Sequence, residues 1–264
     1  MKYKKIIMPI TMAAMATIGY FGGYETAKHR SAAPIKGRYF AIAPEEFTNI
    51  YDSSLRVDRS STLEEKCKDS TTVNHFGSGV LLRDSQTGDE YILTANHMTP
   101  YAPGEDCACN EEKEGKRSER RIKVFESHVT VEELPAVVVK QDKKADQALL
   151  KIEGQVKVKI DGQVKDATPY FGKIASQLHP GNYVLGVGFP DGKHSYSIAN
   201  VESQRKYMTL LNMKLIGGNS GGGVYRFGDK GLELVGTVRG GTAITPLEKM
   251  RELIQGTPLE DDYL

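Results

Sequence analysis

A succession of short apolar runs, each the length of a β-strand, places the strongest constraint on the fold. In residues 76–98, "FGSGVLLRDSQTGDEYILTANHM", two such runs flank a polar turn that contains Gly88. This pattern predicts a β-hairpin with strands near 78–83 and 90–95. Comparable runs recur along the chain: "IKVFES", "PAVVVKQ", "QALLKIE", "NYVLGVGF", "HSYSIANVESQ", "YMTLLNMKL" and "LELVGTV". Turns rather than helices separate them, so they predict an all-β sandwich or barrel pair and not βαβ units.

One helix is expected near the C-terminus, in "TPLEKMRELIQG". Thr245 is expected as its N-cap, Pro246 fits the first helical position, and Glu248 completes a capping box. Gly256 stands where such a helix ends. The apolar residues between them form one stripe, which would dock the helix on a β lobe.

The N-terminus has the composition of an export signal. "MKYKK" is a basic lead, and residues 6–24 contain no charge. Ala14-Met15-Ala16 offers a small-x-small cleavage site, which favours a secretion signal. An uncleaved segment could instead attach the chain to a membrane through residues 6–24. Both of these predict an extracytoplasmic protein. A buried helix of the folded domain is the remaining alternative for this segment.

Export makes the three cysteines relevant, because disulfides persist in oxidising compartments. Cys107 and Cys109 are only two residues apart, which is poor geometry for a bond between them. One bond from Cys67 to either of them is expected, which leaves one thiol free. No nearby His or Cys completes a tetrahedral set, so we expect no metal and no other cofactor. Basic and acidic residues balance at 35 and 34, so no net field favours nucleic acid as a partner.

A glycine-rich segment near the end, "LIGGNSGGGVYRF", surrounds Ser220 with five glycines. It could be a slack loop, a phosphate cradle or the seat of a nucleophile. No Lys-Ser/Thr follows the glycines, which argues against a phosphate loop. A serine nucleophile needs a base and an orienting carboxylate. His97, directly after "YILTAN", and Asp146, at the start of "ADQALLKI", are the candidates for these roles.

The three residues occur in the order His97, Asp146, Ser220, which is the order of the chymotrypsin triad. The segments "LTANH", "DQALLKI" and "GNSGGGV" resemble the three signature segments of chymotrypsin-fold, trypsin-like serine peptidases. The resemblance covers about residues 70–255. It is nearest to the bacterial branch that includes HtrA/Deg-type proteases and glutamyl endopeptidases, here without a PDZ domain.

This resemblance implies an all-β fold of two six-stranded antiparallel β-barrels with a C-terminal helix. The implied organisation is a signal peptide or anchor over 1–30, a linker over 31–65, a first barrel over 66–160, a second barrel with the helix over 161–256, and a tail over 257–264.

The resemblance also implies a serine endopeptidase that acts on proteins or peptides. His97 would be the general base, Asp146 its orienting partner and Ser220 the nucleophile. The backbone N–H groups of Gly218 and Ser220 would form the oxyanion hole. A protein of the same fold that binds peptides or a protein partner without turnover is the alternative.

Specificity is expected to depend on residues that line the substrate cleft. "GTVRGG" resembles the strand beside the cleft, which includes Val238, Arg239 and Gly240. Lys214 falls where a specificity residue often lies, and a cation there would suit an acidic side chain, although a surface lysine is the alternative. His194 could reach the same pocket. Activating zymogens carry Asp before the serine, whereas this chain has an Asn, so activation by a freed N-terminus is not expected.

Overall fold

The structure is a computed structural model that describes residues 6–7, 41–42, 44–63, 71–99, 121–125, 134, 136–160, 163–228 and 231–264. The chain divides into two units, Met1–Phe47 and Thr48–Leu264. In the first, β1 (Ile6–Ile7) pairs antiparallel with β2 (Ala41–Ile42). Apart from β1, the expected export signal lies outside the described residues, as do the three cysteines. No helix among the described residues is long and apolar enough to cross a membrane.

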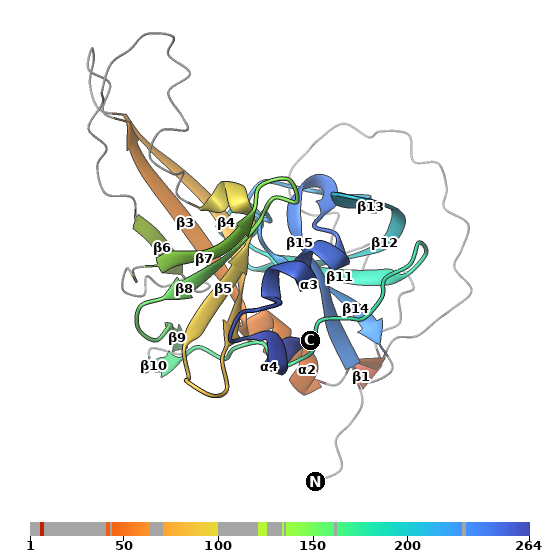
Figure 1. The fold of residues 1–264 in the computed structure, drawn as a ribbon, viewed down its shortest axis with the longest axis horizontal. Coiled ribbons are helices and arrows are strands. Elements are labelled where there is room, and N and C mark those ends of the chain that lie inside the picture. The colour runs from red at the N-terminus through yellow and green to blue at the C-terminus, as the bar shows by residue number, and fades with distance from the viewer. Residues whose placement is uncertain are drawn as a thin grey trace. The chain divides into compact units, whose positions relative to one another are not determined.

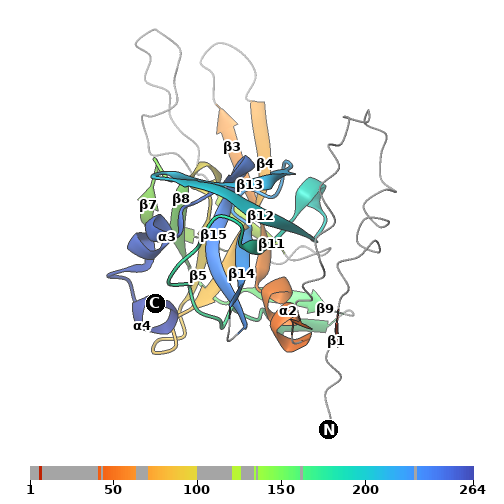
Figure 2. The ribbon, with the colours of Figure 1, turned by 90° about the vertical axis from the view of Figure 1, so that its right-hand side faces the viewer.

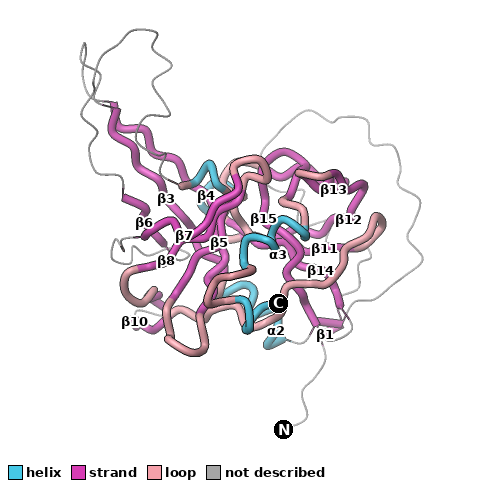
Figure 3. Tube along the Cα trace, viewed as in Figure 1, coloured by secondary structure: helices cyan, strands magenta, loops and turns pink. Residues whose placement is uncertain are grey.

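Strands dominate the second unit (Figure 3), as the sequence predicts. Its first half is a six-stranded antiparallel sheet in the order β6-β3-β4-β5-β8-β7. Figures 1 and 2 show β3 and β4 running side by side along their length. The strands are β3 (Ser54–Leu63), β4 (Thr71–Arg83), β5 (Glu90–Thr94), β6 (Arg121–Phe125), β7 (Ala136–Asp142) and β8 (Gln147–Ile152).

The predicted hairpin is confirmed, since β4 and β5 pair in register from Gly79–Thr94 to Arg83–Glu90. Its turn is held by Asp84, whose carboxylate accepts hydrogen bonds from the Gln86 N–H and the Thr87 hydroxyl. Gly88 has a φ of +76°, a conformation that glycine adopts without steric cost. The turn is therefore specified locally by its own residues.

The second half is a closed antiparallel barrel in the order β11-β12-β13-β15-β14. It has five strands where six were expected. The difference arises because β15 pairs with β14 through residues 231–237 and with β13 through residues 241–244. One long strand therefore occupies two positions. The strands are β11 (Tyr183–Gly188), β12 (Ser195–Arg205), β13 (Met208–Leu215), β14 (Gly223–Gly228) and β15 (Gly231–Ile244).

The segment between the two halves contains a small antiparallel pair, β9 (Lys157–Ile160) and β10 (Gln163–Asp166). Farther on, Tyr170 is fully buried, and its hydroxyl donates to the Leu232 carbonyl at 3.0 Å and accepts from the Leu234 N–H. The connection is thus attached to β15 of the barrel.

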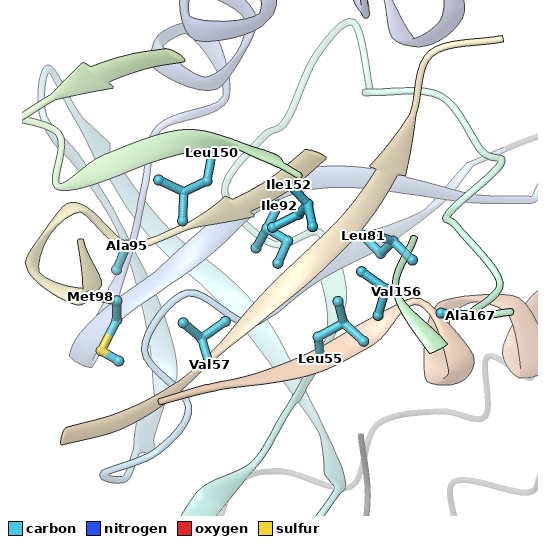
Figure 4. Close-up of a cluster of buried hydrophobic side chains, with 10 residues drawn as sticks. All are labelled: Leu55, Val57, Leu81, Ile92, Ala95, Met98, Leu150, Ile152, Val156 and Ala167. Atoms are coloured by element: carbon cyan, nitrogen blue, oxygen red, sulfur yellow. The ribbon is translucent and has the colours of Figure 1, made fainter. Parts of the chain in front are cut away.

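The core of the first half forms where alternate residues of several strands face inward (Figure 4). Leu55 and Val57 of β3 meet Ile92 of β5 and Leu150 of β8, all with no exposed surface. Met98, just after the hairpin, completes one end of this cluster. At about 25 cal/mol per Å² of apolar surface, such burial supplies the main stabilisation of the sheet.

The expected linker and the expected tail both contain helices or strands. Residues 31–65 include all of α2 (Pro44–Asp52) and all of β3. The linker prediction was wrong for β3, because its strand state depends on pairing with β4 and β6 rather than on its own polar sequence. The expected tail contains α4 (Glu260–Tyr263), and Tyr263 is buried. Burial raises the pKa of Tyr263 to about 12.

The predicted helix is α3 (Leu247–Ile254), and it packs against β7, β8 and β15 (Figure 1). It therefore joins the two halves instead of covering one lobe. Gly256 has a φ of +72°, as expected after a helix end. The capping prediction was wrong: Pro246 is the N-cap, and the Thr245 hydroxyl contacts the Thr237 hydroxyl and donates to the Ala145 carbonyl.

Candidate active site

His97 lies at the centre of a single 3-10 turn, Asn96–Met98, directly after β5. Ala95, which precedes the turn, and Met98, its last residue, are both buried in the core of the first half. The Met98 N–H donates to the Ala95 carbonyl at 3.0 Å, which closes the turn. Because both neighbours are anchored, the imidazole projects from a rigid support while its side chain stays 40% exposed.

Asp146 ends the turn between β7 and β8, residues 143–146. Its φ is +56°, in the left-handed region that Asp tolerates better than most residues. Asp142 shapes this turn, because its Oδ1 accepts hydrogen bonds from the N–H groups of Lys144 and Ala145. An Asp side chain that accepts from the N–H groups two and three residues further on is a common way to fix a turn.

The structure brings His97 and Asp146 together through both oxygens of the carboxylate. The His97 Nδ1 lies 2.9 Å from Asp146 Oδ2. The His97 backbone N–H donates to Asp146 Oδ1 at 3.0 Å. An ionised carboxylate is acceptor-only, so this contact favours the imidazole tautomer with a proton on Nδ1. Nε2 is then the ring atom available as a base.

The Ser220 turn is packed against β4, close to where β4 pairs with the end of β5. The Ser78 N–H, from β4, donates to the Ser220 carbonyl at 2.6 Å. A Cβ on Gly77 would lie 2.8 Å both from that carbonyl and from the Met98 sulfur. Ser220 is therefore next to the turn that carries His97, although it follows it by more than a hundred residues.

The glycines around Ser220 are required by close packing. Gly218 has a φ of +92°, and a Cβ there would lie 2.2 Å from the Phe189 carbonyl oxygen. Gly221 has a φ of +85°, and a Cβ there would lie 2.1 Å from the Ser78 carbonyl oxygen. Positive φ and missing space act together, so a slack loop is the wrong description of this segment.

The expected oxyanion-hole donors, the N–H groups of Gly218 and Ser220, belong to this turn. The N–H groups of Asn219, Gly221 and Gly222 each donate to a backbone carbonyl. In the part of the chain that the structure describes, the N–H groups of Gly218 and Ser220 have no acceptor.

Neighbouring hydrogen bonds set the direction of these two donors. The Gly217 carbonyl accepts from the Asp191 N–H at 3.2 Å, and the Asn219 carbonyl accepts from the Gly222 N–H at 2.8 Å. In a planar trans peptide the N–H points opposite to the C=O of the same unit. The N–H groups of Gly218 and Ser220 therefore point away from the Asp191 and Gly222 N–H groups, respectively, and are oriented before any ligand arrives.

Ser78 is a residue of this site that the sequence interpretation missed. Its side chain is fully buried, and its hydroxyl donates to the Gly218 carbonyl at 2.7 Å while accepting from the Phe189 N–H at 2.8 Å. It thus ties the first half of the chain to the Ser220 turn. No local pattern identifies this role, because both partners lie more than a hundred residues away.

The three expected cleft residues on β15 differ in their surroundings. Val238 is buried and exchanges backbone hydrogen bonds with Gly221 and Gly222. The Arg239 side chain turns toward Asp146, with Nε 3.9 Å from Oδ2. A Cβ on Gly240 would meet nothing within 4 Å, so open space lies beside the strand there.

The other two specificity candidates lie elsewhere on the second unit. Lys214 is in β13, and its side chain falls outside the described part. The His194 ring stacks on Phe189 at 4.5 Å between centroids and lies 3.5 Å from the ring of Tyr51. His194 is therefore part of an aromatic stack. Among the described residues, no cluster of His, Cys, Asp or Glu could hold a metal ion.

Comparison with known families gives one match. No curated protein sequence matches the chain. The sequence profile of the family described as "Trypsin-like peptidase domain" matches residues 77–236, which begin in β4 and end in β15. These residues include the hairpin, the His97 and Asp146 turns, and the Ser220 turn, and they are more than half of the chain. The chain therefore belongs to the trypsin-like peptidase domain family, with the chymotrypsin-like double β-barrel fold.

Proposed function

We propose that this chain is an exported serine endopeptidase that hydrolyses peptide bonds through His97, Asp146 and Ser220. Membership in a peptidase family supports a hydrolase that acts on protein or peptide substrates. The observation that carries the serine mechanism is the 2.9 Å contact between His97 Nδ1 and Asp146 Oδ2, beside the turn that bears Ser220.

In this mechanism the Ser220 hydroxyl attacks the scissile carbonyl carbon, and His97 Nε2 accepts the hydroxyl proton. Asp146 holds the ring and stabilises the imidazolium that forms. The C–N bond then breaks as the imidazolium donates its proton to the leaving amine. A water molecule, activated by His97 in the same way, hydrolyses the acyl-enzyme and releases Ser220.

The two open N–H groups give this mechanism its electrostatic component. The tetrahedral intermediate carries negative charge on the former carbonyl oxygen, and the N–H groups of Gly218 and Ser220 would donate to it. Each such donor is worth roughly 3–4 kcal/mol of activation free energy where one has been removed. Because neighbouring bonds already orient both donors, little reorganisation accompanies the reaction.

The test is labelling with a fluorophosphonate probe, which reacts only with an activated serine. Wild type should label at a 1:1 ratio, and Ser220→Ala should not. Ser176→Ala changes an exposed serine and serves as the matched control, which should label like wild type. Peptide hydrolysis by Ser220→Ala should fall by roughly 10⁴–10⁶-fold.

Two outcomes would contradict the proposal. Wild type that is folded but does not label lacks an activated serine, and tight peptide binding without turnover would then indicate a binding protein of the same fold. Labelling that persists in Ser220→Ala would assign the nucleophile to another serine.

Export rests on the basic lead and the uncharged residues 6–24. N-terminal sequencing of protein recovered from outside the cytoplasm distinguishes the two forms. A start at residue 17 or later indicates a cleaved signal, and an intact Met1 indicates a membrane anchor. Recovery of all active protein from the cytoplasm would contradict export.

A preference for acidic side chains, as Lys214 would confer, stays a prediction. Digestion of a peptide library by wild type and Lys214→Ala tests it. Loss of cleavage after Asp or Glu in the variant alone would support the cation as the specificity residue.

A further inference from the structure

Arg239 lies in β15 directly after Val238, whose backbone holds Gly221 and Gly222 beside Ser220. Its position in the sequence predicts a contact with substrate. Its guanidinium instead donates through Nη1 to the Tyr207 carbonyl, in the turn between β12 and β13. Its Nε lies 3.9 Å from Asp146 Oδ2.

The carboxylate of Asp146 is shared between the base and this arginine. Oδ1 accepts from the His97 backbone N–H, while Oδ2 faces both His97 Nδ1 and Arg239 Nε. The side chains of Asp146 and Arg239 are only 16% and 21% exposed, so water screens this pair less than a surface pair.

A guanidinium is well suited to contact the Tyr207 carbonyl and the Asp146 carboxylate at the same time. It is planar, always charged, and carries several N–H donors in fixed directions. With Nη1 held by the Tyr207 carbonyl, the Nε edge is directed at Asp146. The turn that carries Asp146 is thereby connected to β15 and to the β12–β13 turn, two elements of the barrel.

We propose that Arg239 is a positioning residue for Asp146, which orients the carboxylate on His97 and offsets part of its negative charge. This inference rests on the proposed function. Arg239 acts through Asp146 and does not touch the reacting atoms. It also leaves the open space beside Gly240 free for substrate.

The offset has a defined sign. A positive charge beside Asp146 disfavours a second positive charge on the His97 ring. Removing it should make the imidazolium easier to form, so the fall of activity on the acid side should begin at higher pH. The other titratable groups on the surrounding elements include Asp142, Lys143 and Lys144 of the same turn, Arg205, Lys206 and Tyr207 at the β12–β13 turn, and Glu248, Lys249, Arg251 and Glu252 of α3.

Three variants test the proposal by the dependence of kcat/KM on pH. Arg239→Met removes the charge and should lower the plateau about tenfold, with the acid limb moved up by roughly 0.5–1 pH units. Arg239→Lys keeps the positive charge but loses the planar set of N–H donors. The pH at which kcat/KM falls on the acid side should therefore stay the same, while the maximal kcat/KM falls. The control is Arg251→Met, which removes an arginine bonded to the carbonyls of Ile174 and Ala175, and it should change neither.

Each alternative role gives a different result and would overturn the proposal. A substrate contact would change KM and side-chain preference with the acid limb fixed. A purely structural role would lower the melting temperature and the plateau, again with the acid limb fixed. An unchanged Arg239→Met would show that the arginine does not act on Asp146.

A measurement without turnover separates this inference from the proposed function. In a Ser220→Ala background, the His97 ring signals can be followed by NMR as the pH changes, with and without Arg239→Met. An upward shift of the midpoint supports the positioning role even if wild type fails to label with fluorophosphonate. An identical midpoint overturns that role even if wild type labels fully.

Discussion

The turn that carries Ser220 and the turn that carries Asp146 are held in place by different means. Around Ser220 the constraints are mostly backbone hydrogen bonds and glycines with no room for a side chain, to which the Ser78 hydroxyl adds one side-chain bond. Around Asp146 they are side chains: Asp142 within the turn, and Gln147, whose amide donates to the Lys249 carbonyl of α3. The Ser220 turn requires glycines, because a Cβ would clash there. The Asp146 turn requires particular polar side chains, because they form its hydrogen bonds.

This difference has a consequence for how each turn responds to substitution. A side chain added at Gly218 or Gly221 meets backbone atoms of β4 or of the segment that follows β11, which would have to move. A polar group removed from the Asp146 turn leaves its fold in place but loosens one carboxylate. Three substitutions measure the contrast, beginning with the largest expected effect.

Asp146→Asn should lower kcat by roughly 10⁴-fold with little change in stability, because an amide favours the wrong tautomer of His97. Asn also tolerates the left-handed backbone that Asp146 adopts. Asp146→Ala should be as inactive, and in addition less stable by about 1 kcal/mol. Kinetics and urea unfolding measure the two effects. Equal unfolding free energies of the two variants would show that the left-handed backbone at residue 146 does not affect stability.

Gly221→Ala should destabilise the protein by about 3 kcal/mol or more, since it adds strain at positive φ to contacts with backbone atoms. Gly217→Ala is the matched control, because a Cβ there meets nothing within 4 Å. It should change the unfolding free energy by less than about 0.5 kcal/mol. Similar unfolding midpoints for the two variants would show that the turn has more freedom than its packing indicates.

Gln147→Met should have the smallest effect, a loss of about 1 kcal/mol in unfolding free energy. It removes the bond to Lys249 while keeping a buried side chain of similar length. Gln204→Met, at an exposed position of β12, is the control and should be neutral. A loss of unfolding free energy as large as that of Gly221→Ala would show that the two turns are equally sensitive to substitution.

The sequence predicted the elements that depend on local composition and missed those that depend on distant partners. Strands such as β4, β5 and β8 are apparent from local apolar runs, because a buried strand needs that composition wherever it pairs. The order of His97, Asp146 and Ser220 is likewise readable without coordinates. By contrast, β3 has only a short alternation around Leu55 and Val57, and its strand state follows from the neighbours on both sides.

The sequence by itself determined the strand-rich fold class, the hairpin, the helix near the C-terminus and the candidates for the site. Each of these follows from a short segment of the chain, and the site candidates follow in addition from the order of three such segments. The tertiary structure alone decided three contacts. The Ser78 hydroxyl holds the Ser220 turn, the Thr245 hydroxyl donates to the Ala145 carbonyl instead of capping α3, and the Arg239 guanidinium faces the Asp146 carboxylate. Each of these contacts joins groups about a hundred residues apart, where local propensity carries no information about which donor meets which acceptor.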